Sequence, residues 1–271
     1  MMRSLYTAAS GMKSQQLNVD TIANNLSNVN TTSFKKERIE FKSLLYETML
    51  KANTDENGKG RPVNLQVGHG VRPSATVKTF SQGNIEGTSN PFDFAIEGKG
   101  FFQVQGPNGE KMFTRDGAFK LSIVDDEYTL VSTEGYPIVG EDDEPLKISA
   151  DIDMTKLQIE SDGTFGVLND ENQVESLDIQ FKIVQFRNPV GLEAAGGNFY
   201  KTTSASGEEF SELEMEGVNK SELRQGFIEG SNVEVVQEMV NLIVAQRAYE
   251  VNSKAIQASD EMLTLANQLK R

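Results

Sequence analysis

The sequence predicts an α+β protein of more than one domain, with long N- and C-terminal helices that pair as a coiled coil and an inserted all-β head. The first observation is that apolar or small residues alternate three and four positions apart at both ends of the chain, which is the seam spacing of a coiled coil. The second is that the middle of the chain consists of short β-branched or aromatic runs separated by turn signals.

The N-terminal helix is expected from about Arg3 to Val29. Gln15 is the one polar member of its seam. Its other faces are rich in asparagine and glutamine, which are poorer helix formers than the Glu and Lys of a solvated helix. Either both faces contact another element, or this is a weak helix with a polar face. The seam residues are Leu5, Ala8, Met12, Val19, Ile22, Leu26 and Val29.

Residues 35–80 are expected to form an adaptor region that contains a long extended loop at 46–70. From Lys51 to Gly70 the sequence is polar and rich in turn formers, with one short strand around Leu65 to Val67. The loop has too few apolar residues for a core of its own, so any order in it must come from contact with neighbours.

Residues 81–230 are expected to form the mainly β outer head. Turn signals such as Asp116-Gly117 and Asp162-Gly163 separate its strand-like runs, which predicts hairpins. The expected strands, the first of which precedes the head, are 75–80, 92–96, 101–104, 111–114 and 181–186.

The C-terminal helix is expected from Ser231 to Leu269, where neither Pro nor Gly interrupts the pattern. Ser231 with Glu234 has the capping-box spacing that marks a helix start. With 1–34, residues 231–271 are expected to form a discontinuous helical inner domain, because a seam of this length needs a partner. The seam residues are Ala248, Val251, Ala255, Ala258, Met262, Leu265 and Leu269.

The charge distribution separates the ends from the middle. The formal net charge is −14, which argues against a nucleic-acid partner bound through phosphates. Residues 1–41 carry +2 and 231–271 carry −1, so 42–230 carry −15. The ends are suited to burial between subunits, and the middle is suited to water.

The composition does not indicate the compartment of the protein. The chain has no cysteine and so can form no disulfide, which is compatible with any compartment. The N-terminus has no apolar run of the length that a secretory signal needs, and nowhere do 18 apolar residues run together. Two alternatives remain: a cytoplasmic protein, or one exported by a route that uses no cleavable signal.

No residue set indicates catalysis, and we expect no catalytic, cofactor-binding or metal-binding residues and no cofactor. His69, the single histidine, lies between glycines in the loop, and no nucleophile elbow is present. Gly98-Lys99-Gly100 is a turn rather than a dinucleotide fingerprint, because the next glycine is missing and a strand follows. The acidic runs 141–144 and 151–153 have no EF-hand spacing and are expected to be solvated.

Both termini resemble the axial proteins of the bacterial flagellum, the family of rod and hook proteins. The opening Ser4 to Met12 and the stretch from Asn24 to Lys35 carry the N-terminal resemblance. Gln225 to Val233 and Gln246 to Lys254 carry the C-terminal one, and Ile96 to Phe102 with Phe113 to Gly117 extend it into the head. The motif residues singled out are Asn24, Asn25, Asn28, Asn30, Phe34, Lys35, Gln246, Arg247, Tyr249, Glu250, Asn252, Ser253 and Lys254.

Within that family the chain is most similar to the basal-body rod proteins of the distal rod type, because of Leu65 to Val71 and Phe80 to Asn84. Ser33 stands where the family usually has Gly. The resemblance implies that the stretch at 46–70 straightens the rod, since the hook type lacks it and is bent. The residues assigned to this role are Tyr46, Asn64, Leu65, Gln66, Gly68 and Gly70.

The resemblance implies a structural protein and not an enzyme: a subunit that polymerises helically into a hollow, rigid shaft and transmits motor torque to the hook. The implied partners are further copies of the chain, proximal rod proteins, the hook protein, the surrounding bushing ring and the flagellar type III export apparatus. The implied location is the basal body, in the periplasm. The alternatives are a proximal rod or hook-type protein, or a secreted acidic β-domain enzyme or adhesin.

Overall fold

A computed structural model describes most of the chain, which divides into two units. Unit 1 comprises residues 1–27, 37–78 and 234–271, and unit 2 comprises 28–36 and 79–233. The structure describes residues 2–54, 60–61, 63–124, 127–149, 152, 156–168, 174–213, 217 and 219–269. The expected acidic pair at 151–153 lies outside the described residues.

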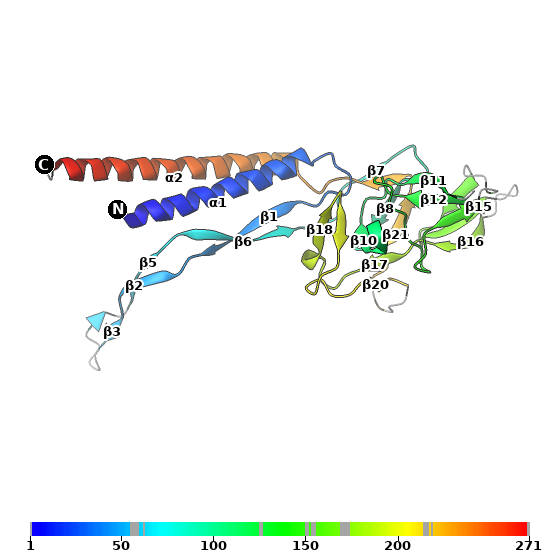
Figure 1. Cartoon of the computed structure of the whole chain (residues 1–271), viewed down its shortest axis with the longest axis horizontal. Coiled ribbons are helices and arrows are strands. Elements are labelled where there is room, and N and C mark those ends of the chain that lie inside the picture. The colour runs from blue at the N-terminus through cyan, green and yellow to red at the C-terminus, as the bar shows by residue number, and fades with distance from the viewer. Residues whose placement is uncertain are drawn as a thin grey trace. The chain divides into compact units, whose positions relative to one another are not determined.

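Unit 1 contains the two long helices, α1 (Met2–Ser27) and α2 (Val235–Leu269), which lie side by side with both chain termini at the same end of the pair (Figure 1). The helix α1 ends two residues before Val29. The helix α2 begins at Val235, and the Ser231 hydroxyl accepts a hydrogen bond from Val233 N at 3.3 Å. Within the described residues no helix combines the length and the apolar character that would let it span a membrane.

Unit 1 also contains an antiparallel ribbon where the sequence predicts an extended loop. Strand β1 (Glu37–Ser43) pairs with β6 (Val71–Lys78), and β2 (Tyr46–Leu50) pairs with β5 (Leu65–Gly68). The short strands β3 (Asn53–Thr54) and β4 (Gly60–Arg61) pair beyond them. The prediction of a loop at 46–70 was therefore wrong in its local structure, apart from the short strand expected around Leu65 to Val67, which is part of β5. Every residue of β2 is exposed, so backbone pairing rather than a buried core orders this stretch.

Unit 2 is β-rich, and it contains most of the strands of the chain. Its largest sheet has six strands in the order β18-β19-β10-β9-β17-β20. Their bounds are β18 Glu193–Gly196, β19 Phe199–Lys201, β10 Lys111–Thr114, β9 Phe101–Gln105, β17 Ile183–Gln185 and β20 Phe210–Ser211.

Smaller sheets complete unit 2. Two have three strands each, in the orders β11-β12-β13 and β14-β15-β16. Two are strand pairs, β8 with β21 and β7 with β22. Their bounds are β11 Lys120–Val124, β12 Glu127–Val131, β13 Lys147–Ser149, β14 Leu157–Ile159, β15 Thr164–Leu168, β16 Val174–Gln180, β8 Phe94–Glu97, β21 Glu222–Gln225, β7 Ile85–Gly87 and β22 Phe227–Glu229. Each expected strand overlaps an observed one, and 111–114 matches β10.

The core of unit 2 is built from phenylalanines on these strands. Phe181 lies centrally, with its ring 4.9 Å from the ring of Phe165 and 5.1 Å from that of Phe94. A second cluster surrounds Phe101. Gly117 packs so closely on this core that a Cβ there would lie 1.7 Å from the Phe94 carbonyl oxygen, so the sequence needs glycine at this turn.

Candidate assembly surfaces

The contact between α1 and α2 is made by small and polar residues. A Cβ on Gly11 would lie 3.0 Å from Asn252 Nδ2, so the helices approach closely there. Near their free ends the hydroxyls of Ser4 and Ser259 are 3.4 Å apart. In the described part of the two helices, Ile22 is the only large apolar side chain that either helix buries, and their other buried residues are small or polar. Their pairing within one subunit therefore gains little from the hydrophobic effect.

The predicted seam of α1 faces inward in part. Ala8 and Ile22 are buried, and Leu5, Met12, Val19 and Leu26 are partly buried. Val29 is partly buried and lies beyond the helix, in unit 2. The three-and-four spacing in the sequence therefore identified a face of α1 that is only partly buried within the subunit.

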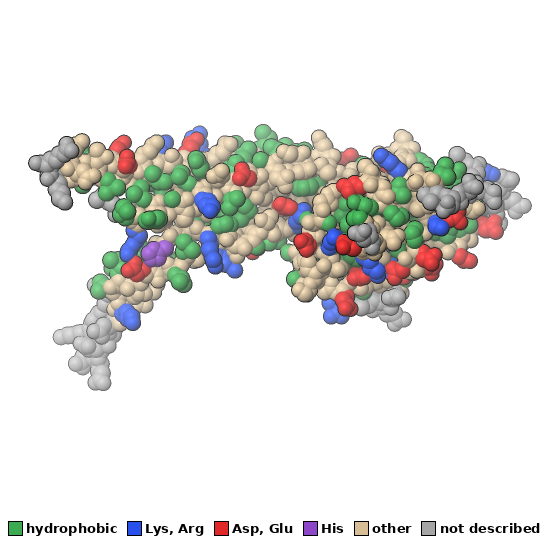
Figure 2. Space-filling view, viewed as in Figure 1, with side chains coloured by type: hydrophobic (Ala, Val, Ile, Leu, Met, Phe, Trp, Pro, Cys, Tyr) green, Lys and Arg blue, Asp and Glu red, His purple; other side chains and the backbone are tan. Residues whose placement is uncertain are grey.

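The predicted seam of α2 lies on an exposed face of the helix. Ala248 is partly buried, whereas Val251, Ala255, Ala258, Met262, Leu265 and Leu269 are exposed. The residues near α1 are offset by one position, as Asn252 and Ser259 show. One position turns about 100° around a helix, so an apolar face remains uncovered in the subunit. Figure 2 shows hydrophobic side chains exposed along the helices of unit 1.

The N-terminal motif residues connect elements of the same chain. The Asn25 side chain donates to the Glu37 carbonyl at 2.8 Å and accepts from Glu37 N at 2.9 Å, so it pairs with β1 as a strand would. Asn25 Nδ2 also donates to Glu238 Oε2 of α2 at 3.1 Å. Thr31 donates to Asn28 Oδ1 at 3.1 Å, while Asn24 and Asn30 are exposed.

The motif residues of α2 are mostly exposed within the subunit. Arg247 pairs with Glu250 at 2.9 Å on the surface. Asn252 packs on Gly11. The others are Gln246, Tyr249 and Lys254, which are exposed, and Ser253, which is partly buried. This part of the motif therefore lies largely on the surface of the subunit.

The hairpin of β2 and β5 includes the residues assigned to rod straightening. Tyr46 is opposite Gly68, and Gln66 is opposite Thr48. Asn64 Oδ1 accepts a hydrogen bond from Ala52 N at 2.6 Å. Tyr46 and Leu65 are exposed, so the hairpin presents apolar side chains to its surroundings.

The base of the hairpin is fixed to α1. Arg3 forms an ion pair with Glu47, and His69 Nε2 lies 3.6 Å from Glu47 Oε2. Gly70 has φ +108°, and a Cβ there would lie 2.1 Å from Ser10 Oγ. The predicted loop histidine therefore lies beside a carboxylate at the point where the hairpin meets the helix.

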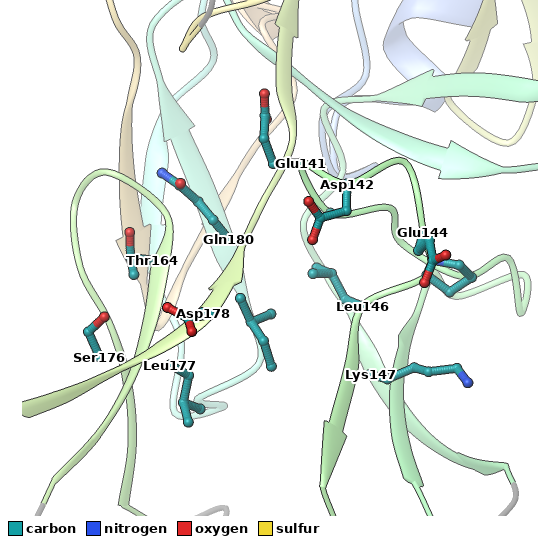
Figure 3. Close-up of a pocket in the computed structure, with 13 residues that line it drawn as sticks. Glu141, Asp142, Glu144, Leu146, Lys147, Thr164, Ser176, Leu177, Asp178 and Gln180 are labelled. Carbon is teal, nitrogen blue, oxygen red and sulfur yellow. The ribbon is translucent and has the colours of Figure 1, made fainter.

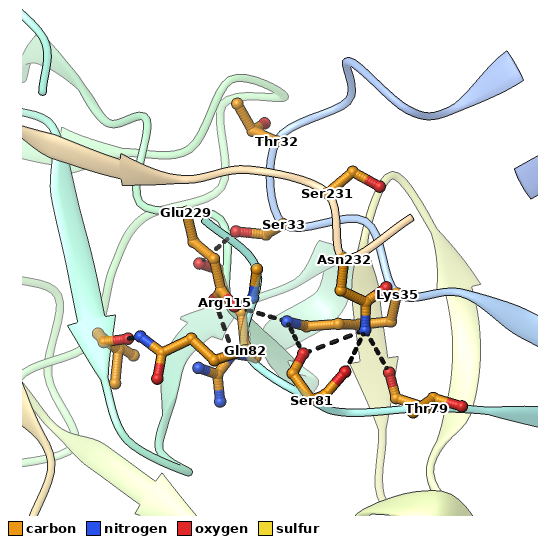
Figure 4. Close-up of polar contacts among 12 residues, drawn as sticks. Thr32, Ser33, Lys35, Thr79, Ser81, Gln82, Arg115, Glu229, Ser231 and Asn232 are labelled. Carbon is orange, nitrogen blue, oxygen red and sulfur yellow. Dashed lines mark hydrogen bonds and ion pairs between the residues drawn. The ribbon is translucent and has the colours of Figure 1, made fainter. Parts of the chain in front are cut away.

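Unit 2 contains a buried network of charged side chains, in which the motif residue Lys35 meets Arg115 and Glu229, two residues that the sequence did not indicate as site residues (Figure 4). Glu229 Oε1 accepts from Lys35 Nζ at 2.6 Å and from Gly83 N at 2.8 Å, and Glu229 Oε2 accepts from Arg115 Nε at 2.9 Å. Arg115 donates further to the carbonyls of Gly100 and Gly98, at 3.1 and 2.9 Å. All three charged side chains are almost completely buried.

Burial and the neighbouring charges act against each other at both Lys35 and Glu229. Burial lowers the pKa of Lys35 to about 8, and the Glu229 carboxylate opposes that shift. Burial alone would raise the pKa of Glu229, but the charges of Arg115 and Lys35 hold it below its usual range. At neutral pH the network thus contains two cations and one anion in a dry site.

The acidic segment 141–144 lines a cavity of about 490 Å³ in unit 2. The side chains of Glu141, Asp142 and Glu144 point in different directions (Figure 3). Glu141 Oε1 accepts from the Ser211 hydroxyl at 2.8 Å. In the described part of the chain no three His, Cys, Asp or Glu residues are grouped as a metal site would need.

Three segments of the chain match family models of flagellar axial proteins. Residues 5–35 match "Flagella basal body rod protein", 95–167 match "Flagellar hook protein FlgE/F/G D1 domain", and 224–269 match "Flagellar basal body rod FlgEFG protein C-terminal". The helical ends with a β-rich middle region thus define the class of flagellar rod and hook proteins.

Full-length relatives narrow that class. The chain is 46% identical to a flagellar basal-body rod protein FlgG of Borreliella burgdorferi, with 100% of each chain covered. It is 42% identical to that of Buchnera aphidicola subsp. Schizaphis graminum (99% of this chain, 100% of the relative) and 35% identical to that of Bacillus subtilis (100% of each). The chain belongs to the flagellar basal-body rod protein FlgG family, whose members are structural proteins of the basal body and not enzymes.

Proposed function

We propose that this chain is a subunit of the distal rod, which polymerises helically into a hollow, rigid shaft that carries motor torque to the hook. The observation that carries the proposal is the apolar face of α2, which the subunit itself leaves exposed. An uncovered apolar face on a long helix is suited to repeated contacts between identical subunits, and a heterologous contact that does not close generates a helix.

The proposal includes the arrangement expected from the family. Residues 1–34 and 231–271 form a coiled-coil inner domain, 35–80 form an adaptor, and 81–230 form an all-β outer head. The partners are further copies, proximal rod proteins, the hook protein and the bushing ring. Export through the flagellar type III apparatus without a cleavable signal delivers the subunit to the periplasm.

We further propose that the hairpin of β2 and β5 straightens the rod. Its support is an exposed apolar surface, at Tyr46, Met49 and Leu65, on a ribbon whose base is held by α1. Contacts of this ribbon with neighbouring subunits would oppose the sliding that bending requires. The hairpin favours the distal rod over the alternatives of a proximal rod or hook-type protein.

Charge placed on the exposed face of α2 tests the assembly proposal. Val251 and Leu265 are 65% and 59% exposed in the subunit, so Val251→Asp or Leu265→Asp should leave unit 2 folded. In a dry interface between subunits each aspartate would cost on the order of several kcal/mol, and rods should be absent. Basal bodies isolated from the variant strains and imaged by electron microscopy report the result.

The matched control is Gln257→Asp, which adds the same charge at an exposed position of the same helix outside the predicted seam. We expect rods and motility close to wild type for this variant. Rods of normal length and normal motility with Val251→Asp and Leu265→Asp would refute the assembly proposal.

A further inference from the structure

Two connecting segments meet in unit 2, one from each side of the chain. The first is 28–36, which follows α1, and the second is 227–233, which precedes α2. Ser33 N donates to the Glu229 carbonyl at 2.8 Å, and Asn232 N donates to the Phe34 carbonyl at 3.3 Å. Lys36 N donates to Asn232 Oδ1 at 2.7 Å, so the two segments are hydrogen-bonded along their length.

Each segment also has contacts elsewhere in unit 2. In the first, the Ser33 hydroxyl donates to the Arg115 carbonyl at 2.7 Å, and Asn198 Nδ2 donates to the Thr32 carbonyl at 2.8 Å. Glu229 is bound by three donors, and two of these, Arg115 Nε and Gly83 N, lie outside the first segment. The Asn232 side chain also donates to the carbonyls of Thr79 and Ser81, at 2.8 and 3.1 Å. The second segment is therefore held on unit 2 by contacts that do not involve the first segment.

The first segment depends on the second through a charge. Lys35 is completely buried, and Glu229 is the carboxylate with which it pairs. Its ammonium also donates to the Ser81 carbonyl at 3.0 Å, but this dipole carries no countercharge. Without Glu229, seating the first segment would bury Lys35 beside the Arg115 cation with no anion between them, which is strongly unfavourable.

We propose that Glu229 makes the docking of these segments sequential: 227–233 seats on Arg115 and Gly83, and 28–36 docks only afterwards. The first segment therefore stays undocked until a residue near the other end of the chain is in place. The dependence runs in one direction, because Glu229 keeps Arg115 and Gly83 as donors when Lys35 is absent.

Hydrogen exchange on the full-length wild type and its variants tests this direction. In wild type, 28–36 should be less protected than 227–233, because the first segment can undock while the second stays seated, whereas the second cannot open while the first is docked. Glu229→Gln should lower protection in both segments by about tenfold or more, while the core strand β9 stays protected. Glu222→Gln, an exposed carboxylate on β21, is the matched control and should change neither segment.

Two results would overturn the proposal. One is retained protection of 28–36 in Glu229→Gln. The other is stronger protection of 28–36 than of 227–233 in wild type, which would mean that the first segment stays docked when the second opens. If Glu229→Gln unfolds the core strands as well, the decision rests on which of the two segments is better protected in wild type.

Discussion

At the scale of single residues, the buried network of Lys35, Arg115 and Glu229 decides much of the electrostatics of unit 2. Lys35 has a pKa of about 8 in the folded chain against 10.5 for an ordinary lysine. Between these values the unfolded chain holds a proton that the folded chain has released, so the free energy of unfolding rises with pH. Below about pH 8 the lysine is charged in both states, and its burial penalty is then constant.

We therefore predict that wild type gains stability relative to Lys35→Met as the pH rises from about 8 to 10.5, by at most about 3 kcal/mol. Urea unfolding of the full chain, followed by circular dichroism at several pH values, measures the difference. Lys99→Met, at an exposed lysine of the same unit, is the control and should run parallel to wild type. A difference between wild type and Lys35→Met that stays constant over this range would contradict the prediction.

Ser33, next to this network, has a backbone conformation that is unfavourable for most residues other than glycine. Its φ of +55° is in the left-handed region, which favours Gly. Its hydroxyl donates to the Arg115 carbonyl at 2.7 Å, a hydrogen bond that glycine could not make. The side chain thus offsets part of the conformational cost with a buried contact.

At the scale of elements, the hairpin of β2 and β5 can be removed cleanly. Glu47 is opposite Val67, so replacing residues 48–66 by Asn-Gly closes the ribbon with a two-residue turn. We predict rods that still polymerise but bend, because the contacts that oppose sliding are lost while the helices are untouched.

Electron microscopy of isolated basal bodies checks the prediction. Straight rods of unchanged stiffness, or no rods at all, would assign the hairpin another role. A hairpin of the same length with Tyr46, Met49 and Leu65 changed to Ser separates the apolar contacts from the mere presence of the ribbon.

The two long helices were predictable, but the faces they use were only partly so. Spacing alone identifies an apolar seam such as Val251 to Leu265, yet the subunit places Asn252 and Ser259 against α1. Apolar periodicity predicts which face of a helix is buried, but not whether the same subunit or a neighbouring one packs against that face. In the ribbon, backbone pairing orders a polar stretch such as Gln66 and Asn64, which leaves a weak side-chain pattern in the sequence.

The spacing of residues along the sequence could not predict the buried network. Lys35, Arg115 and Glu229 lie in three of the motifs that carry the family resemblance, far apart in sequence. A motif indicates that a residue matters, but the meeting of three motifs in one buried site depends on tertiary packing. The signal available was that each motif has a charged residue within two positions of a phenylalanine: Lys35 after Phe34, Arg115 after Phe113 and Glu229 after Phe227.

At the scale of the whole molecule, we predict that the isolated subunit keeps unit 2 folded while α1 and α2 are largely disordered. The small, polar contact between the helices cannot offset the entropy of ordering them, whereas unit 2 has its own aromatic core. Hydrogen exchange on the purified monomer should find slow exchange in 94–104 and fast exchange in 5–26 and 248–269.

The boundaries of that pattern provide its internal control. Residues 28–36 and 227–233 belong to unit 2 and should remain protected although both adjoin the helices. Strong protection throughout both helices in a monomer would contradict the prediction and would mean that their pairing is stable without neighbours.

The division of the chain has a mechanical consequence. Because unit 1 is made of three stretches and unit 2 of two, the backbone passes between them four times, after residues 27, 36, 78 and 233. A domain on a single tether can swivel about it with little resistance. Here any twist of one unit about the other must be absorbed by four peptide connections at once, so the chain's path by itself resists torsion before any contact is counted.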